Sequence, residues 1–357
     1  MSSNISVLPS SEDQSNQYQN DIFQLAEYHG LGELHFKSDP KTGLRAIIAI
    51  HSTTLGPALG GTRSRIYEST QQAIADVVCL ARGMSYKAAF AGLPYGGGKA
   101  VLLQPETISD RDAYFQSYGK FIDSLGGQFI TAVDVGTSVK DMDLISTQSA
   151  HVLSTSAGHG DPSFYTALGV FRGICAAVKV KFNRDNITGI RVSIQGVGKV
   201  GFHLASLLHE QGAKLRLSDI DPIALEHCTT KFDAIPVSEN EILSLESDIF
   251  SPCALGGVLD ESAVSKVNTQ VICGAANNQL ADDGFGDALH HRNIFYVPDY
   301  VANSGGLMHV ILGDNDELHR RIANIYTAVI DIFERSETAD EPAHRIANAI
   351  AEEILYG

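Results

Sequence analysis

The segment 191-RVSIQGVGKVGFHLASLLHEQGAKLRLS-218 constrains the fold of this chain more than any other stretch. A short apolar run leads into a glycine-rich turn, then a helical apolar pattern, then a second strand-like run, which is the order of a βαβ unit. Strand candidates at 248–251, 271–274 and 295–298, separated by helical stretches, extend this unit into a parallel sheet. We therefore predict an α/β fold whose second half is a Rossmann-type, doubly wound domain.

The turn in this unit carries the spacing GxGxxG at Gly196, Gly198 and Gly201. The first glycine permits a tight turn, the second lets a pyrophosphate approach the backbone, and the third allows close helix packing. Asp219 ends the next strand, where a carboxylate binds an adenosine ribose and repels a 2′-phosphate. The pattern predicts NAD binding. The alternative is a plain connection, with Asp219 capping the turn at Pro222.

Length and composition limit the class of protein. The 357 residues are enough for two domains with a cleft between them. A net charge of −16 without any basic run argues against a nucleic-acid partner. A charged residue interrupts each apolar stretch before it reaches the ~18 residues needed to span a bilayer, so we expect no membrane partner. The N-terminus lacks the pattern of a secretory signal, so we expect a cytoplasmic location. The five cysteines form no CxxC pair, which indicates packing residues and no metal site.

The pattern along the chain predicts the domain boundaries. Residues 1–20 are polar and without periodicity, which predicts a mobile tail, and a turn cluster near residue 40 predicts a hairpin over 34–51. Helical runs at 69–86, 111–125 and 139–148 then alternate with strand-like runs at 100–103 and 129–135. We predict a first α/β domain over 21–155 and a dinucleotide-binding domain over 156–334. Helical patterns at 306–334 and 342–355 indicate that residues 335–357 return to the first domain.

The segment 83-GMSYKAAFAGLPYGGGKAV-101 contains two lysines in unusual surroundings. Lys87 is expected at a helix end, and Lys99 follows the glycines of residues 96–98 and precedes an apolar run. Bare backbone around Lys99 permits close approach by a ligand and indicates a partly desolvated ammonium. The alternative is a pair of solvated surface lysines.

Taken together, the motifs resemble the glutamate/leucine/phenylalanine/valine dehydrogenase family, most closely its leucine dehydrogenases. The likeness covers roughly residues 30 to 350 and rests on GPALGGTR, GMSYK, GLPYGGGKAV, TAVDVGT, GVGKVG, SPCALGG, GAANNQL and DYVANSGG, in the order and approximate spacing of the family. It implies an N-terminal substrate and oligomerisation domain, an NAD-binding domain, and a homo-oligomer. The implied reaction is oxidative deamination of an amino acid to a 2-oxo acid, ammonia and NADH.

The resemblance also implies roles for individual residues. Lys99 would activate water and polarise the developing carbonyl oxygen, and Asp134 would exchange protons with the substrate amino group. The alternative role of Asp134 is to cap a helix that starts near Thr137. Lys87 would bind the substrate carboxylate. The other expected substrate contacts are Leu59, Gly60, Ala132, Asn303, Leu307 and Val310.

The cofactor implied by the resemblance is NAD. Thr166 and Asn277 would hold its carboxamide, although a buried Thr or Asn is equally often a satisfied turn residue. The other expected cofactor contacts are Gly196, Gly198, Lys199, Val200, Gly201, Asp219, Cys253, Ala254 and Ala275.

The implied side-chain pocket is aliphatic, which leaves the side-chain carboxylate of glutamate without a partner. Ala132 stands where aromatic members of the family tend to have glycine, so we expect leucine, valine or isoleucine as substrate. Val133 and His309 depart from the leucine-type pattern, and His309 could reshape the pocket toward a larger ring. A phenylalanine- or tryptophan-type dehydrogenase is the runner-up, and a non-catalytic NAD-binding regulator is a third interpretation.

Overall fold

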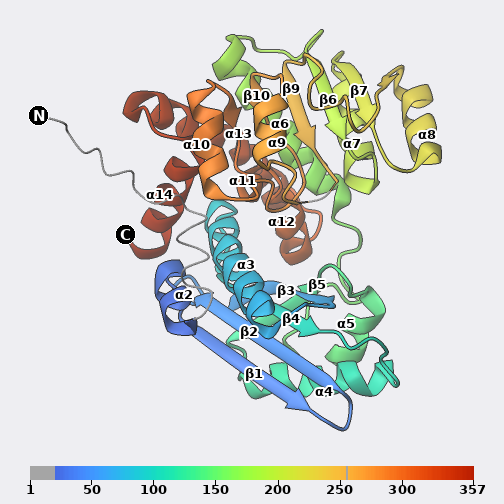
Figure 1. Cartoon of the computed structure of the whole chain (residues 1–357), viewed down its shortest axis with the longest axis vertical. Coiled ribbons are helices and arrows are strands. Elements are labelled where there is room, and N and C mark those ends of the chain that lie inside the picture. The colour runs from blue at the N-terminus through green and yellow to red at the C-terminus, as the bar shows by residue number, and fades with distance from the viewer. Residues whose placement is uncertain (1–20, 255) are drawn as a thin grey trace, which may run out of the picture.

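The computed structural model describes residues 21–254 and 256–357, and the tail expected over residues 1–20 lies outside the described residues. A five-stranded sheet and a six-stranded sheet occupy opposite halves of the molecule, and helix α3 (Thr70–Phe90) lies between them (Figure 1). The predicted α/β class with two sheet-based halves is confirmed. The exact domain boundaries stay a prediction.

The first sheet is mixed, in the order β1-β2-β4-β3-β5. The predicted hairpin is confirmed, because β1 pairs antiparallel with β2, whereas β3 runs parallel to β4 and β5. Strand β3 was missed, since the segment GPALGGTR offers few β-branched residues. The strands are β1 (Glu33–Asp39), β2 (Leu44–Ser52), β3 (Ala58–Arg65), β4 (Gly96–Leu103) and β5 (Phe129–Val133).

Alternation along β2 gives this sheet two cores. Leu44 and Ile48 face a cluster with α4 (Arg111–Ser124) and α5 (Val139–Ser146), and Ile47 faces one with α3 and α2 (Ile22–His29). Polar caps fix where these helices begin: the side chains of Ser69, Asp110 and Ser138 accept backbone N–H groups at the starts of α3, α4 and α5.

The second sheet is parallel throughout, in the order β11-β10-β9-β6-β7-β8. The chain runs outward from β6 to β8, then returns to β9 and runs outward to β11, so the strand order reverses between β6 and β9, as in doubly wound folds. The strands are β6 (Arg191–Gln195), β7 (Lys214–Ser218), β8 (Ile235–Pro236), β9 (Ile249–Pro252), β10 (Val271–Ile272) and β11 (Phe295–Tyr296). The Rossmann-type prediction is confirmed.

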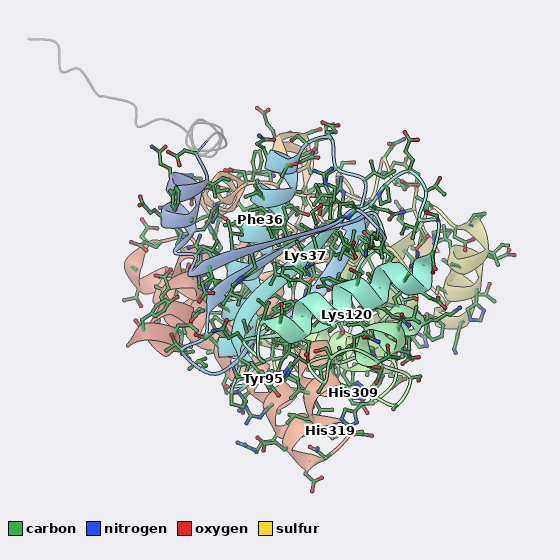
Figure 2. The ribbon with its side chains drawn as sticks, turned by 90° about the horizontal axis from the view of Figure 1, so that it is seen from below. Phe36, Lys37, Tyr95, Lys120, His309 and His319 are labelled. Carbon is green, nitrogen blue, oxygen red and sulfur yellow. The ribbon has the colours of Figure 1, made fainter. Side chains whose placement is uncertain are left out.

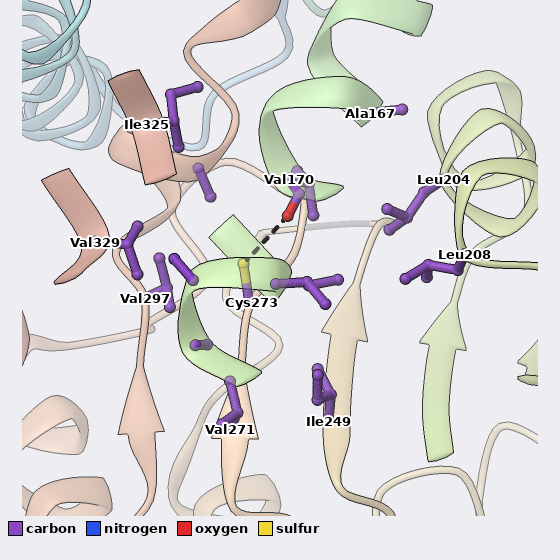
Figure 3. Close-up of a cluster of buried hydrophobic side chains, with 14 of the residues drawn as sticks. Ala167, Val170, Leu204, Leu208, Ile249, Val271, Cys273, Val297, Ile325 and Val329 are labelled. Atoms are coloured by element: carbon purple, nitrogen blue, oxygen red, sulfur yellow. Dashed lines mark hydrogen bonds between the residues drawn. The ribbon is translucent and has the colours of Figure 1, made fainter. Parts of the chain in front are cut away.

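Helices cover both faces of this sheet. They are α6 (Ser163–Phe182), α7 (Lys199–Glu210), α8 (Pro222–Phe232), α9 (Glu261–Lys266), α10 (Asp283–His291), α11 (Asp299–Ala302), α12 (Gly305–Leu312), α13 (Asp316–Ala339) and α14 (Ala343–Tyr356). Within the described residues, α6 alone is long and apolar enough to cross a membrane. It is a core helix, however: Val170 packs between the sheet and α13, and its carbonyl accepts the Cys273 thiol (Figure 3).

The C-terminal region corrects one expectation. The helical pattern over 306–334 forms two helices, because Gly313 adopts a left-handed φ of 69° and Asn315 caps the start of α13. The last helix, α14, packs against α3 on one side and against α10 and α13 on the other. All five cysteines are free, but only Cys228 and Cys273 are buried as expected of packing residues, and Cys79 is exposed.

Close packing of α3 on β4 explains Gly97 of β4. A Cβ atom at Gly97 would collide with the backbone nitrogen and Oγ of Ser85. We expect Gly97→Ala to lower the free energy of unfolding by about 1 to 3 kcal/mol, the usual cost of overpacking, measured by thermal melts. Gly83→Ala, on the same helix with open space around its Cβ position, is the control and should hold or raise Tm. An unchanged Tm for Gly97→Ala would contradict this packing.

Candidate active site

A cavity of about 620 Å³ lies between the two halves of the molecule. Its walls come from β3, β4, β5 and α3 on one side and from α6, α11, α12 and the loop around Asn277 on the other. Linker residues around His159 also line it. This is the size and placement of a small-molecule site in a cleft between domains.

An ion pair between Lys99 and Asp134 stands at the bottom of this cavity, with Nζ and Oδ2 2.7 Å apart. Lys99 comes from β4 and is only 6% exposed, and Asp134 follows β5. Strand β3 lies between those two strands, but it presents Gly60 and Gly61 here. A Cβ atom at Gly61 would fall 2.8 Å from Asp134 Cβ. The bare backbone of β3 therefore leaves the room in which the two side chains meet.

The environment of Asp134 keeps its carboxylate ionised. Burial is the largest influence and opposes ionisation, but the positive charges of Lys99 and Arg63 outweigh it, so the pKa of Asp134 lies below its ordinary value. The alternative role in helix capping is wrong. Ser138 caps α5, whereas Asp134 contributes its backbone N–H to Thr137 Oγ1 and turns its carboxylate toward Lys99.

Lys87 lies in the last turn of α3 and reaches across the cavity. Its Nζ donates to Asn277 Oδ1 at 2.9 Å, and Asn303 donates to the same oxygen at 2.9 Å. Burial lowers the pKa of Lys87 to about 8; the Asp299 carboxylate opposes this shift and the Lys99 ammonium adds to it. Three residues predicted from separate motifs thus share one hydrogen-bonded cluster.

The residues expected to contact the substrate side chain line the same cavity. Leu307 and Val310 present one face of α12, at i and i+3, opposite β3 and β5. Val133 also lines the cavity. His309 does not: it is buried and stacks on the Tyr165 ring, with ring centroids 4.2 Å apart. The expected residues in the lining are Leu59, Gly60, Ala132, Asn303, Leu307 and Val310.

The expected cofactor residues divide into two groups. Part of the set lines the cavity: Thr166, Val200, Ala275 and Asn277. The rest lies outside that lining, at the carboxyl ends of β6, β7 and β9 or at the start of α7: Gly196, Gly198, Lys199, Gly201, Asp219, Cys253 and Ala254. These ends are where doubly wound sheets bind dinucleotides.

The glycine-rich turn has room for a pyrophosphate. Gly196 has a φ of 92°, which favours glycine, and a Cβ atom at Gly201 would collide with the Gly196 carbonyl. Nothing lies within 4 Å of a Cβ position at Gly198, and α7 begins there without a side-chain cap. Its first backbone N–H groups therefore face space that suits an anion.

The carboxylate of Asp219 braces this turn. It accepts the backbone N–H of Val197 at 2.6 Å and that of Asp221 at 2.9 Å. Asp221 caps the helix that starts at Pro222, and Asp219 caps the turn before it, so the capping role of Asp219 is confirmed and its role toward a ribose stays a prediction. Lys199, at the start of α7, forms an ion pair with Asp161 of the linker at 2.8 Å.

Three charged residues of the cavity lining were missed, namely Arg63, Asp161 and Asp299. Arg63 ends the motif GPALGGTR and contacts Asp134, and Asp299 opens DYVANSGG and is buried beside Lys87. Burial raises the pKa of Asp299, and Lys87 opposes that shift. Arg63 and Asp299 could have been identified as site residues because they lie within two of the family motifs. Among the described residues, no group of three or more His, Cys, Asp or Glu side chains is arranged to hold a metal.

Comparison with known proteins places this site in a family. The model of the Glu/Leu/Phe/Val dehydrogenase dimerisation domain matches residues 32–151, and that of Glutamate/Leucine/Phenylalanine/Valine dehydrogenase matches residues 218–352. The chain is 42% identical to leucine dehydrogenase of Geobacillus stearothermophilus over 342 residues, 94% of this chain and 93% of the relative. The chain belongs to the Glu/Leu/Phe/Val dehydrogenase family. The predicted family is confirmed.

Other members of the family are similar to the same degree. Valine dehydrogenase of Streptomyces virginiae is 43% identical, over 89% of this chain and 91% of the relative. The crystal structure of L-tryptophan dehydrogenase from Nostoc punctiforme matches with a TM-score of 0.83 and 39% identity, over 93% of this chain and 98% of that chain. This Glu/Leu/Phe/Val dehydrogenase is therefore an amino-acid dehydrogenase of a family that uses NAD(P), and similarity alone does not select its substrate.

The environment of Lys87 predicts its reactivity. Only the neutral amine reacts with acetic anhydride, so acetylation of Lys87 should rise as the pH passes through about 8. An ordinary exposed lysine titrates near 10.4. Peptide mass spectrometry across a pH series measures this, with the exposed lysines of the same sample as internal control. Acetylation of Lys87 that rises together with those lysines would contradict the desolvated environment.

Proposed function

We propose that this chain is an NAD-dependent L-amino-acid dehydrogenase that converts a small apolar amino acid of the leucine, valine or isoleucine class to its 2-oxo acid. Water and NAD are consumed, and ammonium, NADH and a proton are released. The observation that carries the proposal is the buried Lys99–Asp134 pair beside an aliphatic wall of the cavity.

Lys87 and Asn303 orient the substrate in this proposal. The Lys87 ammonium binds the substrate carboxylate, which replaces the amide oxygen of Asn277 as its partner. Asn277 is then free to meet the cofactor carboxamide together with Thr166. In this proposal the substrate amino group lies beside Asp134, a carboxylate that lines the same cavity as Lys87.

Lys99 and Asp134 carry the proton transfers. Bound NAD supplies the acceptor for the hydride that leaves the substrate Cα. Asp134 first takes a proton from the substrate ammonium group. Lys99, whose ammonium has by then released its own proton to solvent, takes a proton from the water that adds to the imine carbon, and the ammonium formed in this way stabilises the oxygen as the carbonyl forms. Asp134 returns a proton to the departing amine. The pair is suited to this exchange because its two groups are 2.7 Å apart and shielded from bulk water.

The choice of NAD over NADP rests on Asp219. Its carboxylate is fixed beside the glycine-rich turn by the N–H groups of Val197 and Asp221. A negative charge held there favours a free ribose hydroxyl and disfavours a 2′-phosphate.

The substrate class rests on the side-chain subsite. Leu59, Ala132, Leu307 and Val310 are all aliphatic, and a carboxylate side chain would lose its hydration there without gaining a partner. Discrimination by one methyl or methylene group is worth only ~1 to 3 kcal/mol, so several branched-chain amino acids should react.

We also propose a homo-oligomer and a cytoplasmic location. Strand β1 is an edge strand of the first sheet, and Phe36 on it is 53% exposed (Figure 2). Strand pairing between two copies would cover this edge. The free cysteines fit a reducing compartment.

A substrate panel tests the proposal. NADH absorbance is followed with leucine, valine, isoleucine, phenylalanine, tryptophan and glutamate, each with NAD and NADP. We expect turnover of the aliphatic amino acids with NAD, and a loss of about 10²- to 10⁴-fold in kcat for Lys99→Ala. Lys120→Ala, on the exposed surface of α4, is the matched control. Turnover of aromatic amino acids alone would move the chain to that class. NAD binding without any turnover would favour a regulator, and normal turnover by Lys99→Ala would contradict the mechanism.

A further inference from the structure

We propose that Arg63 is a positioning residue of the active site, braced by Asp76 and Tyr67, which holds the carboxylate of Asp134 in place while Lys99 serves the substrate. This inference rests on the proposed function, because it concerns how the two proposed catalytic residues are held in position relative to each other.

The brace is a chain of contacts that starts outside the cavity. The hydroxyl of Tyr67 donates to Asp76 Oδ2 at 2.7 Å, and Arg63 Nη1 donates to both oxygens of Asp76, at 3.0 and 3.1 Å. Asp76 belongs to α3, the helix that also carries Lys87. Arg63 belongs to β3, the strand between Lys99 and Asp134 in the sheet. The contacts thus tie the active-site helix to the strand that underlies the ion pair.

The Nε side of the Arg63 guanidinium faces Asp134. Arg63 Nε lies 3.4 Å from Asp134 Oδ2, the oxygen that Lys99 also contacts. Arg63 Nε donates no hydrogen bond to any of the described residues, so this N–H is available to the carboxylate. The planar fork of arginine allows this double engagement, since Nη1 is bound to Asp76 while Nε faces Asp134. The single ammonium of a lysine could not serve both sites.

A second cation is needed because Lys99 has two duties. Lys99 must release its proton before it can act as a base, and if it does so before Asp134 has taken up a proton, it no longer neutralises the Asp134 carboxylate. A carboxylate with only 16% of its side chain exposed would then lose its counter-charge, which is costly in a site shielded from water. Arg63, with 18% of its side chain exposed, stays beside Asp134 throughout. It therefore keeps Asp134 ionised and correctly placed to receive the proton of the substrate ammonium group.

Arg63→Gln tests this role, with Arg65→Gln as the matched control. Arg65 lies two positions along β3 and also contacts Tyr67, 5.0 Å over its ring, but it is exposed and outside the cavity lining. We expect Arg63→Gln to lower kcat about 10- to 100-fold, the usual effect of an outer hydrogen-bonding partner, with little change in KM. The acid limb of kcat/KM should move upward by about one pH unit, because Asp134 loses a neighbouring positive charge. Arg65→Gln should change neither quantity.

Two further variants guard against a purely structural effect. Tyr67→Phe and Asp76→Asn leave Arg63 in the chain but remove parts of its brace, and both should shift the acid limb in the same direction by less. Thermal melts establish that each variant is folded. Wild-type kcat and an unshifted acid limb in folded Arg63→Gln would overturn the proposal.

Two crystal structures separate this proposal from the proposed function, because they do not depend on activity. In Lys99→Ala we expect Asp134 to keep its position beside Arg63 Nε, and in Arg63→Gln/Lys99→Ala we expect its carboxylate to turn away. An Asp134 carboxylate that holds the same position in both variants would overturn the positioning role, whatever the enzyme acts on. Failure of the wild-type chain to oxidise any amino acid would instead refute the proposed function.

Discussion

The contact between Lys99 and Asp134 depends on a strand that offers no side chains. Lys99 and Asp134 come from β4 and the end of β5, which are separated by β3, and they meet because β3 has Gly61 at that point. A larger residue at Gly61 would press against Asp134 and disturb its contact with the ammonium. A buried charge pair is stable only with good geometry and further partners, and Arg63 supplies one of these. The proposed catalytic chemistry thus depends on the bare glycine backbone of β3.

The second half of the molecule completes the site from across the cavity. Lys87 bonds to Asn277, so a lysine of one half and an amide of the other already touch. A substrate carboxylate can replace this contact directly, and its arrival would free Asn277 for the cofactor. The glycine-rich turn and the carboxyl ends of β6, β7 and β9 lie farther along the same side, where a dinucleotide extends away from the reacting atoms.

The features that the sequence predicted well are those with a local signal. The βαβ unit around Gly196 and the hairpin before Ser52 have clear periodicity and turn residues, and the two lysines stand out because glycines surround them. Strand β3 was missed because glycines mask strand propensity. The break at Gly313 was missed although Gly313 and the polar residues 314–317 after it are a turn signal. The partnership of Arg63 with Asp134 links distant parts of the chain, so no local pattern could reveal it.

The most direct test of the account is a crystal structure with NADH and 4-methyl-2-oxopentanoate, the 2-oxo acid of leucine. The account predicts that the 2-oxo oxygen lies within hydrogen-bond distance of Lys99 Nζ, that the carboxylate binds Lys87 Nζ, and that the Lys87–Asn277 hydrogen bond is broken. A ligand whose reacting carbon lies away from both Lys99 and Asp134 would contradict the central claim.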